Sequence, residues 1–168
     1  MKKAAEKTAK HKRPSWDEYF LDLVEMVGLR GTCDRGYSGS VLVKDKRILA
    51  TGYVGSPIGI VHCDEVGHEM HTISGEDGAV SRHCLRTAHA ELNAIANAAR
   101  FGINIEGSTL YCKMVPCYTC AKTIINSGIK RVVALKDYHG AKKTKEIFKQ
   151  AKIKLKIINK EIELYEDQ

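Results

Sequence analysis

The stretch Thr87–Ala94, T-A-H-A-E-L-N-A, and the stretch Val115–Cys120, V-P-C-Y-T-C, decide how this 168-residue chain is built. His89 offers an imidazole, and Cys117 and Cys120 offer two thiolates. Zinc prefers these donors in a tetrahedral arrangement. Three protein ligands leave the fourth position open, which distinguishes a catalytic zinc site from a closed structural one. The sequence therefore predicts a catalytic zinc centre.

The spacing of the two cysteines suits the start of a helix. Cys117 and Cys120 are three residues apart, so they share one side of a helical turn. Pro116 is favoured at a helix start, where its missing N–H is not needed. Thiols at a helix N-terminus have lowered pKa values, which favours the thiolate that binds metal. We expect a helix over residues 117–127 that presents both sulfurs to the metal.

Glu91 follows the ligand histidine by two residues. The pattern H-x-E followed by P-C-x-x-C is the signature of zinc-dependent nucleobase deaminases, and it gives the glutamate the role of general acid and base. We expect Glu91 to take a proton from the activated water, pass it to the substrate ring nitrogen and protonate the leaving ammonia. The alternative, in which C-x-x-C is a redox pair or part of a zinc ribbon, does not require the glutamate.

The rest of the sequence predicts alternating helices and strands. Ser15 and Glu18 form a capping box at the start of an amphipathic helix that ends at Gly28. A second helix, over residues 87–100, is mostly apolar around its circumference and is expected to be central and buried. Further elements are a helix at 141–150 and strands at 40–44, 47–54, 108–113, 131–136 and 153–157. The last strand alternates isoleucine or leucine with lysine, as edge strands do. We expect an α/β fold, a three-layer α/β/α domain over residues 14–168 with a mixed sheet of about five strands.

The segment at about 55–86 lacks periodicity and is rich in glycine, histidine and acidic residues. An insert that buries little apolar surface can be held by a closed zinc site. The expected ligands of this second, structural zinc are Cys33, Cys63, His68 and Cys84, with His71 and His83 as alternates. Because the spacing matches no fixed metal pattern, free thiols and surface histidines are the alternative.

The net charge of +7 is unevenly distributed. Residues 1–13 carry six basic side chains and one acidic one, which leaves +2 for the rest of the chain. We expect residues 1–13 to be a disordered basic tail and nucleic-acid binding to be absent. The chain has no apolar run of about 18 residues and no apolar signal-peptide core, so we expect a cytoplasmic protein without a membrane segment.

Several stretches together carry a resemblance to a known family. They are G-Y-V-G-S-P-I-G (52–59), H-C-D-E-V-G-H (62–68), H-C-L-R-T-A-H-A-E (83–91), I-E-G-S-T-L-Y (105–111) and P-C-Y-T-C (116–120). With them, the chain resembles the deoxycytidylate (dCMP) deaminase family, including its bacterial late-competence branch, from about residue 15 to 158. The resemblance implies a cytidine deaminase-like fold, conversion of dCMP to dUMP and ammonia, and a supply of dUMP for thymidylate synthesis. It also implies a second zinc, a homo-hexamer, and control by dCTP and dTTP, with Mg²⁺ accompanying the triphosphate.

The resemblance also implies roles for individual residues. Substrate contacts fall on Tyr138 and Ala90, and a subunit contact falls on Arg100. Nucleotide control falls partly on the effector loop, which consists of Gly52, Tyr53, Val54, Gly55, Ser56 and Pro57. The family loop usually reads G-Y-N-G, and the valine at position 54 cannot hydrogen-bond a sugar hydroxyl as an asparagine can.

A 5′-phosphate requires a cationic or backbone N–H partner. Arg35, Arg86 and Lys136 are available for this contact, and we include Arg35 among the substrate-binding candidates.

Two other functions are weighed against dCMP deamination. A base deaminase acting on tRNA or single-stranded nucleic acid shares the zinc signature, but it should carry a basic, aromatic surface along its body. A zinc-bound binding or competence module without catalysis would not need Glu91. The modest charge of the body and the presence of the glutamate favour the nucleotide deaminase.

Overall fold

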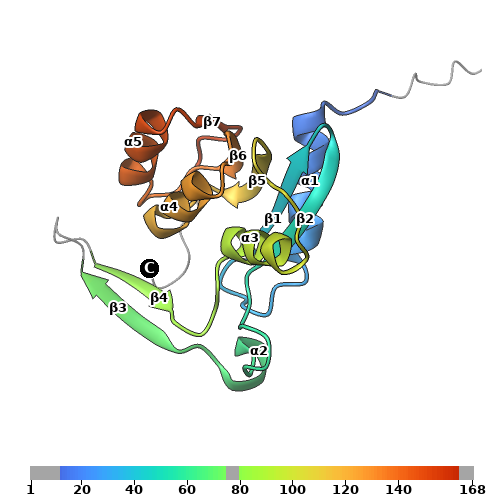
Figure 1. Ribbon diagram of the computed structural model, residues 1–168. Coiled ribbons are helices and arrows are strands. Elements are labelled where there is room, and N and C mark those ends of the chain that lie inside the picture. The colour runs from blue at the N-terminus through green and yellow to red at the C-terminus, as the bar shows by residue number, and fades with distance from the viewer. Residues whose placement is uncertain (1–11, 75–79, 163–168) are drawn as a thin grey trace, which may run out of the picture.

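The structure is a computed structural model that describes residues 12–74 and 80–162 (Figure 1). Most of the predicted basic tail therefore lies outside the described residues. The central sheet has the strand order β2–β1–β5–β6–β7. Its strands are β1 (Gly39–Lys44), β2 (Arg47–Tyr53), β5 (Thr109–Met114), β6 (Arg131–Lys136) and β7 (Lys154–Ile157). Strand β1 is antiparallel to β2 and β5, whereas β5, β6 and β7 are parallel. The predicted mixed five-stranded sheet is confirmed.

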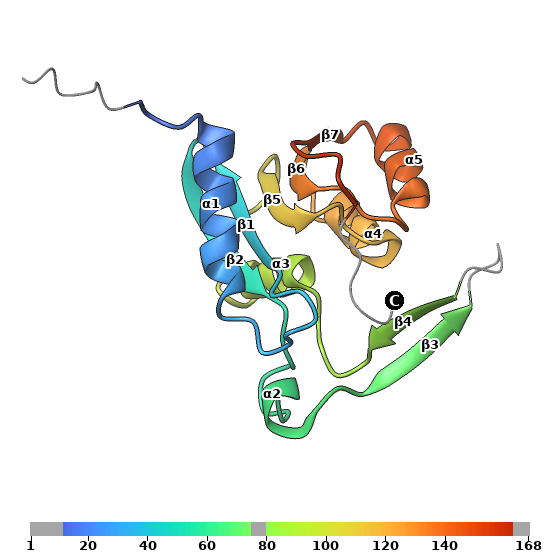
Figure 2. The ribbon, with the colours of Figure 1, turned by 180° about the vertical axis from the view of Figure 1, so that it is seen from behind.

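Helices cover both faces of this sheet (Figure 2). Helix α1 (Trp16–Gly28) lies on one face, and α3 (Ala90–Arg100), α4 (Tyr118–Asn126) and α5 (Lys142–Gln150) lie on the other. The predicted capping box is present, because Glu18 N donates to Ser15 Oγ and Ser15 N donates to Glu18 Oε2. The three-layer α/β/α architecture is therefore confirmed.

The strands divide the core between the two faces by simple alternation. On β1, Val41 and Val43 face α1 and pack with Phe20, whereas Leu42 faces the other three helices. On β5, Tyr111 faces α1, whereas its neighbour Leu110 faces the other three helices. The second face carries the larger buried cluster, and that cluster brings α3 and α4 together at the predicted metal ligands.

Helix α3 differs from the prediction in its start and in its burial. It begins at Ala90 rather than at Thr87, with His89 as its N-cap residue. Its buried side is narrow and includes Ala94 and Ala98, while Ala96 is exposed. The prediction of a central, buried helix overestimated its burial, because alanine suits solvent-facing helical positions as well as core positions.

The insert is more regular than predicted. It contains the short helix α2 (Cys63–Val66) and an antiparallel hairpin of β3 (Met70–Ser74) and β4 (Val80–Cys84). This hairpin forms a separate two-stranded sheet that projects from the body as an arm (Figures 1 and 2). Its sequence lacks the apolar alternation by which strands are recognised.

Among the described residues, no helix is long and apolar enough to cross a bilayer.

Candidate metal centre and active site

The first residues of α3 and α4 bring the three predicted zinc ligands together. His89 and Cys117 are the N-cap residues of the two helices, and Cys120 lies one turn into α4. The Nδ1 of His89 lies 3.3 Å from Cys120 Sγ and 3.5 Å from Cys117 Sγ. Pro116 immediately precedes the N-cap instead of occupying the first helical turn. The convergence depends on α3 packing beside α4 over the sheet.

The spacing of these atoms fits a tetrahedral zinc site. Zn–S bonds of about 2.3 Å and Zn–N bonds of about 2.0–2.1 Å place a nitrogen and a sulfur ligand about 3.5 Å apart. The two distances from His89 agree with this value, and all three ligand atoms lie within 4.8 Å of one another. The donor set of one imidazole and two thiols also suits zinc. The residues present therefore fit the metal.

The electrostatics of the ligands favour a thiolate paired with an imidazolium. A hydrogen bond from Cys120, together with the neighbouring His89, lowers the pKa of Cys117 to about 4. The hydrogen bond with Cys117 raises the pKa of His89 to about 9. A cation at this point would replace the proton that the two groups share, because zinc binds thiolate and neutral imidazole.

A pocket opens beside the ligands and contains the predicted catalytic glutamate. Glu91 lines it, as do His89, Ala90, Cys117 and Tyr138. Burial raises the pKa of Glu91, while the adjacent imidazole of His89 opposes that shift. A carboxyl group whose pKa is raised in this way is suited to accept and return protons during a reaction. The ring of Tyr138 lies against that of His139, with centroids 4.4 Å apart, at the end of β6.

A second cluster of metal-binding side chains lies where the arm joins the body. Cys33, Cys63 and His68 place their ligand atoms within 4.8 Å of one another. The Cys33 sulfur lies 3.8 Å from His68 Nδ1, and the Cys63 and Cys84 sulfurs lie 3.6 Å apart. Two sulfur ligands of a tetrahedral zinc are about 3.8 Å apart. Cys33, Cys63 and His68 could therefore hold a metal ion, whereas Cys84 lies beside Cys63 but does not belong to this group of three.

The polar partners around this cluster resemble those of structural zinc sites. His68 uses its other ring nitrogen, Nε2, to contact Asp34 Oδ1 at 2.8 Å, as metal-ligating histidines usually do with a carboxylate. Burial opposes ionisation of Cys84, but backbone N–H groups of Glu69 and Arg86 bring its pKa down to about 7. Neither of the two alternate ligands belongs to the compact group of Cys33, Cys63 and His68. His71 is exposed on β3, whereas His83 lines the catalytic pocket.

The three candidate phosphate contacts have different locations. Arg35 lines the catalytic pocket, whereas Arg86 and Lys136 are not among its described lining residues. Arg86 instead lies 3.7 Å from the carboxylate of Glu69. Lys113 of β5 lines the pocket as well, and the sequence analysis missed it. A lysine within the otherwise apolar strand Thr109–Met114 was the signal that could have identified it.

The loop Gly52–Pro57, which the sequence predicted to bind effectors, reaches the catalytic pocket through Val54. Gly52 packs so closely under α3 that a Cβ atom would meet Ala94 N at 2.2 Å. Tyr53 is partly exposed, and Val54 lines the catalytic pocket. Gly55 forms a β-bridge with Ala88 next to the ligand His89. The remaining loop members are Ser56, half-buried, and Pro57, exposed.

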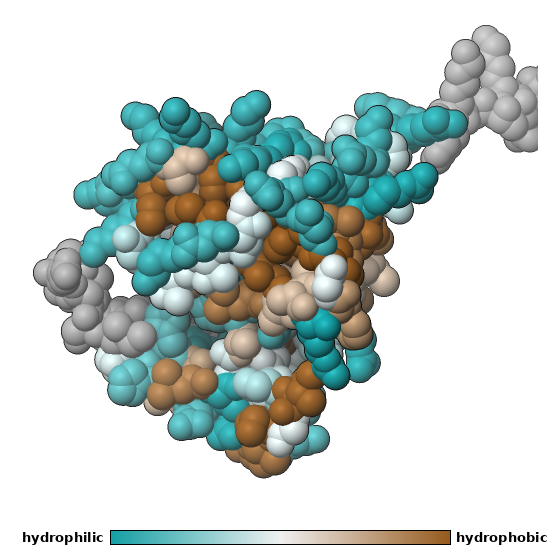
Figure 3. All heavy atoms as spheres, in the orientation of Figure 1, coloured by the Kyte–Doolittle hydropathy of each residue, from teal (hydrophilic) through white to brown (hydrophobic). Residues whose placement is uncertain are grey.

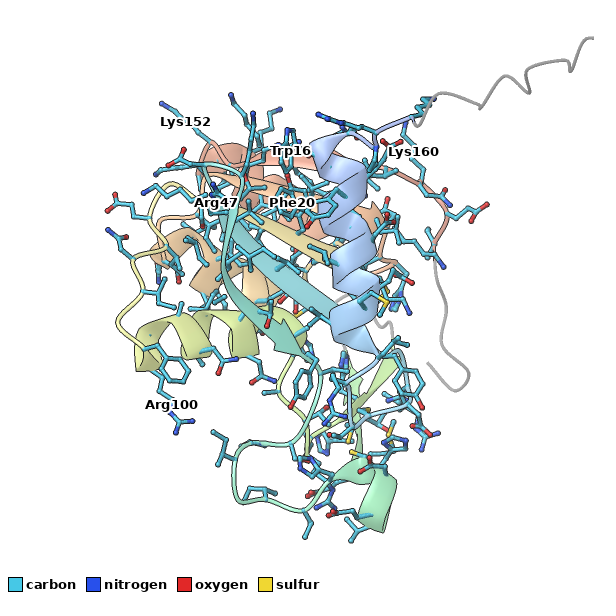
Figure 4. All side chains as sticks on the ribbon, turned by 90° about the vertical axis from the view of Figure 1, so that its right-hand side faces the viewer. Trp16, Phe20, Arg47, Arg100, Lys152 and Lys160 are labelled. Atoms are coloured by element: carbon cyan, nitrogen blue, oxygen red, sulfur yellow. The ribbon has the colours of Figure 1, made fainter. Side chains whose placement is uncertain are left out.

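Arg100 is remote from the pocket. Its side chain extends outward at the end of α3 (Figure 4) and lies over the ring of Phe101 at 5.6 Å. Phe101 is itself 69% exposed. This cation–aromatic pair is therefore available at the surface.

Comparison with known proteins agrees with this geometry. Residues 14–136 match the family described as the cytidine and deoxycytidylate deaminase zinc-binding region. ComE operon protein 2 of Bacillus subtilis is 40% identical over 139 residues, covering 83% of this chain and 69% of that protein. The deoxycytidylate deaminase of Mycobacterium phage D29 is 39% identical, covering 74% of this chain and 98% of that protein. The match to the Schizosaccharomyces pombe deoxycytidylate deaminase, 35% identical over 86% of this chain, spans only 44% of that relative.

Solved structures support the same relationship. The dCMP deaminase of cyanophage S-TIM5, solved in complex with dCMP and dUMP, matches with a TM-score of 0.69 and 27% identity. The match covers 88% of this chain and 99% of that one. A tRNA:A34 deaminase, 20% identical with a TM-score of 0.54, shares the fold. Because the family profile covers most of the sequence and close relatives align along it, the chain belongs to the cytidine and deoxycytidylate deaminase family of zinc-dependent hydrolases.

Proposed function

We propose that this protein deaminates dCMP to dUMP and ammonia, and so supplies dUMP for thymidylate synthesis. The observation that carries this proposal is the placement of Glu91 in one pocket with the ligands His89 and Cys117. Relatives named deoxycytidylate deaminase, at 39% and 35% identity, support dCMP as the substrate. So does the cyanophage structure that contains dCMP and dUMP.

In this proposal, each pocket residue has a defined task. His89, Cys117 and Cys120 would hold the zinc, which would supply a Lewis acid for activating water. Glu91 would accept a proton from the water and deliver it to the pyrimidine ring nitrogen as the hydroxide adds to the amine-bearing carbon. It would then take the remaining proton of that hydroxyl group and give it to the amine, so that the C–N bond breaks, ammonia leaves and the carbonyl forms. Tyr138 and Ala90 line the same pocket, and the base would lie against them.

Regulation by dCTP and dTTP, with Mg²⁺ accompanying the triphosphate, is a further part of the proposal. The loop Gly52–Pro57 contacts both α3 and the pocket, so a nucleotide bound there would act close to the ligand His89. Repeating the activity assay with each triphosphate tests this point. If neither dCTP nor dTTP changes the rate, the substitution at Val54 has removed the control.

A second, structural zinc and a homo-hexamer are also proposed. Cys33, Cys63, His68 and Cys84 would hold the zinc and join the arm to the body. Apolar side chains gather in the lower part of Figure 3, where the insert lies. Among the residues of the insert, Ile58 is 84% exposed. Together with the exposed pair of Arg100 and Phe101, these apolar side chains support subunit contacts.

The free cysteines are compatible with the proposed cytoplasmic location.

The test of the main proposal is a substrate panel. The zinc-loaded chain is assayed for ammonia release with dCMP, deoxycytidine, CMP, cytidine and an RNA hairpin. We expect dCMP to be the preferred substrate and dUMP to form in equal amount to ammonia. Deamination of the hairpin without turnover of dCMP would instead favour a nucleic-acid base deaminase.

A further inference from the structure

The catalytic pocket is lined by more cations than anions. Of the described residues that line it, Glu91 is the single carboxylate, while Arg35, Arg82 and Lys113 are cations. His83, from β4, lies close enough to both His89 and Arg35 for their charges to lower its pKa, after the larger effect of burial. His83 lines the same pocket as the metal ligand His89 and Arg35. A ligand that fits this pocket should be neutral at one end and anionic at the other.

The guanidinium of Arg35 is held in place with one nitrogen unused. Its Nη1 donates to the backbone carbonyl of Arg82 at 3.2 Å and to Met70 Sδ at 3.3 Å. Its Nη2 is buried and has no hydrogen-bond partner within the described part of the chain. Because a buried donor without an acceptor is unfavourable, an anion beside Arg35 would remove an existing penalty.

Lys113, from strand β5, supplies a second cation to the same pocket. Its Nζ donates to the carbonyl of Gly36 at 2.7 Å, so the ammonium lies next to the residue that follows Arg35. Both side chains line the pocket that contains Glu91. A guanidinium and an ammonium that line one pocket suit a phosphate monoester, whose oxygens accept several hydrogen bonds.

We propose that Arg35 and Lys113 form the seat for the 5′-phosphate of the substrate, and that the second metal cluster keeps Arg35 in position. This inference rests on the proposed function, because it concerns the nucleotide that the pocket would accept. It selects Arg35 over Arg86 and Lys136, and it adds Lys113.

The positioning role follows from where the cluster residues lie. Cys33 is two residues before Arg35, and Cys84 is two residues after Arg82, whose carbonyl holds the guanidinium. Cys63 and His68 join these two segments through distances of 3.6 and 3.8 Å. Loss of the cluster would free the loop and the arm from each other, and Arg35 would lose its fixed carbonyl partner.

Binding measured without turnover tests the phosphate seat. The full-length, zinc-loaded Glu91→Gln variant is titrated with dCMP and with deoxycytidine, and inorganic phosphate is used as a competitor. Adding Arg35→Met should weaken dCMP binding about 10- to 100-fold, as expected for loss of a charge-assisted contact. Deoxycytidine binding should change by less than about twofold, as expected if the contact is confined to the phosphate. Lys113→Met should act in the same direction, and Arg35→Lys should retain part of the preference for dCMP.

A matched control uses Arg86→Met, an arginine in the segment that follows β4 but outside the pocket, which should leave the preference for dCMP unchanged. If Arg35→Met weakened both ligands equally, or neither, the phosphate seat would be refuted. A parent variant that bound neither dCMP nor deoxycytidine would refute the proposed function itself.

A separate variant, Cys63→Ser, tests whether the second metal cluster positions Arg35. Cys63 does not line the pocket, so Cys63→Ser in the same background changes the cluster without touching the ligand. It should remove one zinc and reproduce the selective loss of dCMP affinity, with deoxycytidine binding reporting that the pocket is still folded. Loss of the zinc with an unchanged preference for dCMP would show that the cluster does not position Arg35.

Discussion

The Nδ1 of His89 lies 3.3 Å from the sulfur of Cys120, although 31 residues separate them in the sequence. Each residue is placed by the start of its own helix, so their distance depends on how α3 and α4 pack on the sheet. The metal centre is therefore sensitive to changes beneath either helix, even where no ligand is altered.

Gly52 provides a direct test of this dependence. A Cβ atom there would lie 2.2 Å from Ala94 N and 2.3 Å from Ala90 O, so α3 would have to move. We expect Gly52→Ala to destabilise the fold by about 1–3 kcal/mol, which lowers the unfolding temperature by about 2–4 °C per kcal/mol. Zinc affinity should fall as well.

The control for this variant is Ala96→Ser on the exposed side of the same helix, which should change stability by less than about 0.5 kcal/mol. Thermal unfolding and a competitive zinc titration provide the measurements. A Gly52→Ala protein with wild-type stability and zinc affinity would show that the close packing is unimportant.

The second cluster predicts the metal content of the protein. Purified chain should contain close to two zinc ions, and Cys63→Ser should contain close to one, as measured by elemental analysis. Because metal binding stabilises the fold that forms the site, we expect this variant to lose about 2 kcal/mol or more. Cys112→Ala is the matched control, since that buried thiol contacts the Val133 carbonyl within the core. A zinc content near one in the unmodified chain would eliminate the second site.

The hydrogen bonds and ion pairs of the Asp17 carboxylate should make the stability of the protein depend on pH. It accepts hydrogen bonds from Arg131 at 2.7 and 2.9 Å, from Lys156 at 2.7 Å and from Tyr111 at 2.9 Å. The Arg131 guanidinium, helped by Lys156, holds the pKa of Asp17 well below its ordinary value of 3.8. The stabilisation is therefore complete above about pH 5 and is lost as the pH falls through the folded-state pKa.

We expect Asp17→Asn to lose about 1–3 kcal/mol at pH 7. The difference from the wild type should narrow as the pH falls below about 4. Asp22→Asn, at an exposed position of the same helix, is the control and should have little effect. Urea unfolding at a series of pH values measures both. A deficit that stayed constant down to pH 2 would contradict the role of the ionised carboxylate.

Much of the fold could be predicted because local signals agreed with the tertiary structure. The capping box at Ser15, the alternation of lysines with apolar residues near Ile153, and the C-x-x-C at a helix start each depend on a few neighbouring residues. The arm escaped prediction for the opposite reason. Its strands β3 and β4 pair with each other and show no apolar alternation that marks a core-facing side.

The functional site, too, could be predicted from the sequence only in part. His89, Glu91, Cys117 and Cys120 lie in two short motifs, so their chemistry could be interpreted from spacing alone. The place of Lys113 and His83 in one pocket depends on how β4 lies relative to β5, which no local pattern encodes. The sequence therefore indicated His83 as an alternate zinc ligand, whereas the structure places it on the pocket wall.

The central claim is that Glu91 moves protons at a zinc centre held by His89, Cys117 and Cys120. Its most direct test compares dUMP formation from dCMP by the wild type and by Glu91→Gln at matched zinc content. Removal of a general acid and base should lower kcat by about 10²- to 10⁴-fold, while the zinc bound to the variant remains unchanged. Full turnover by a zinc-loaded Glu91→Gln protein would contradict the claim.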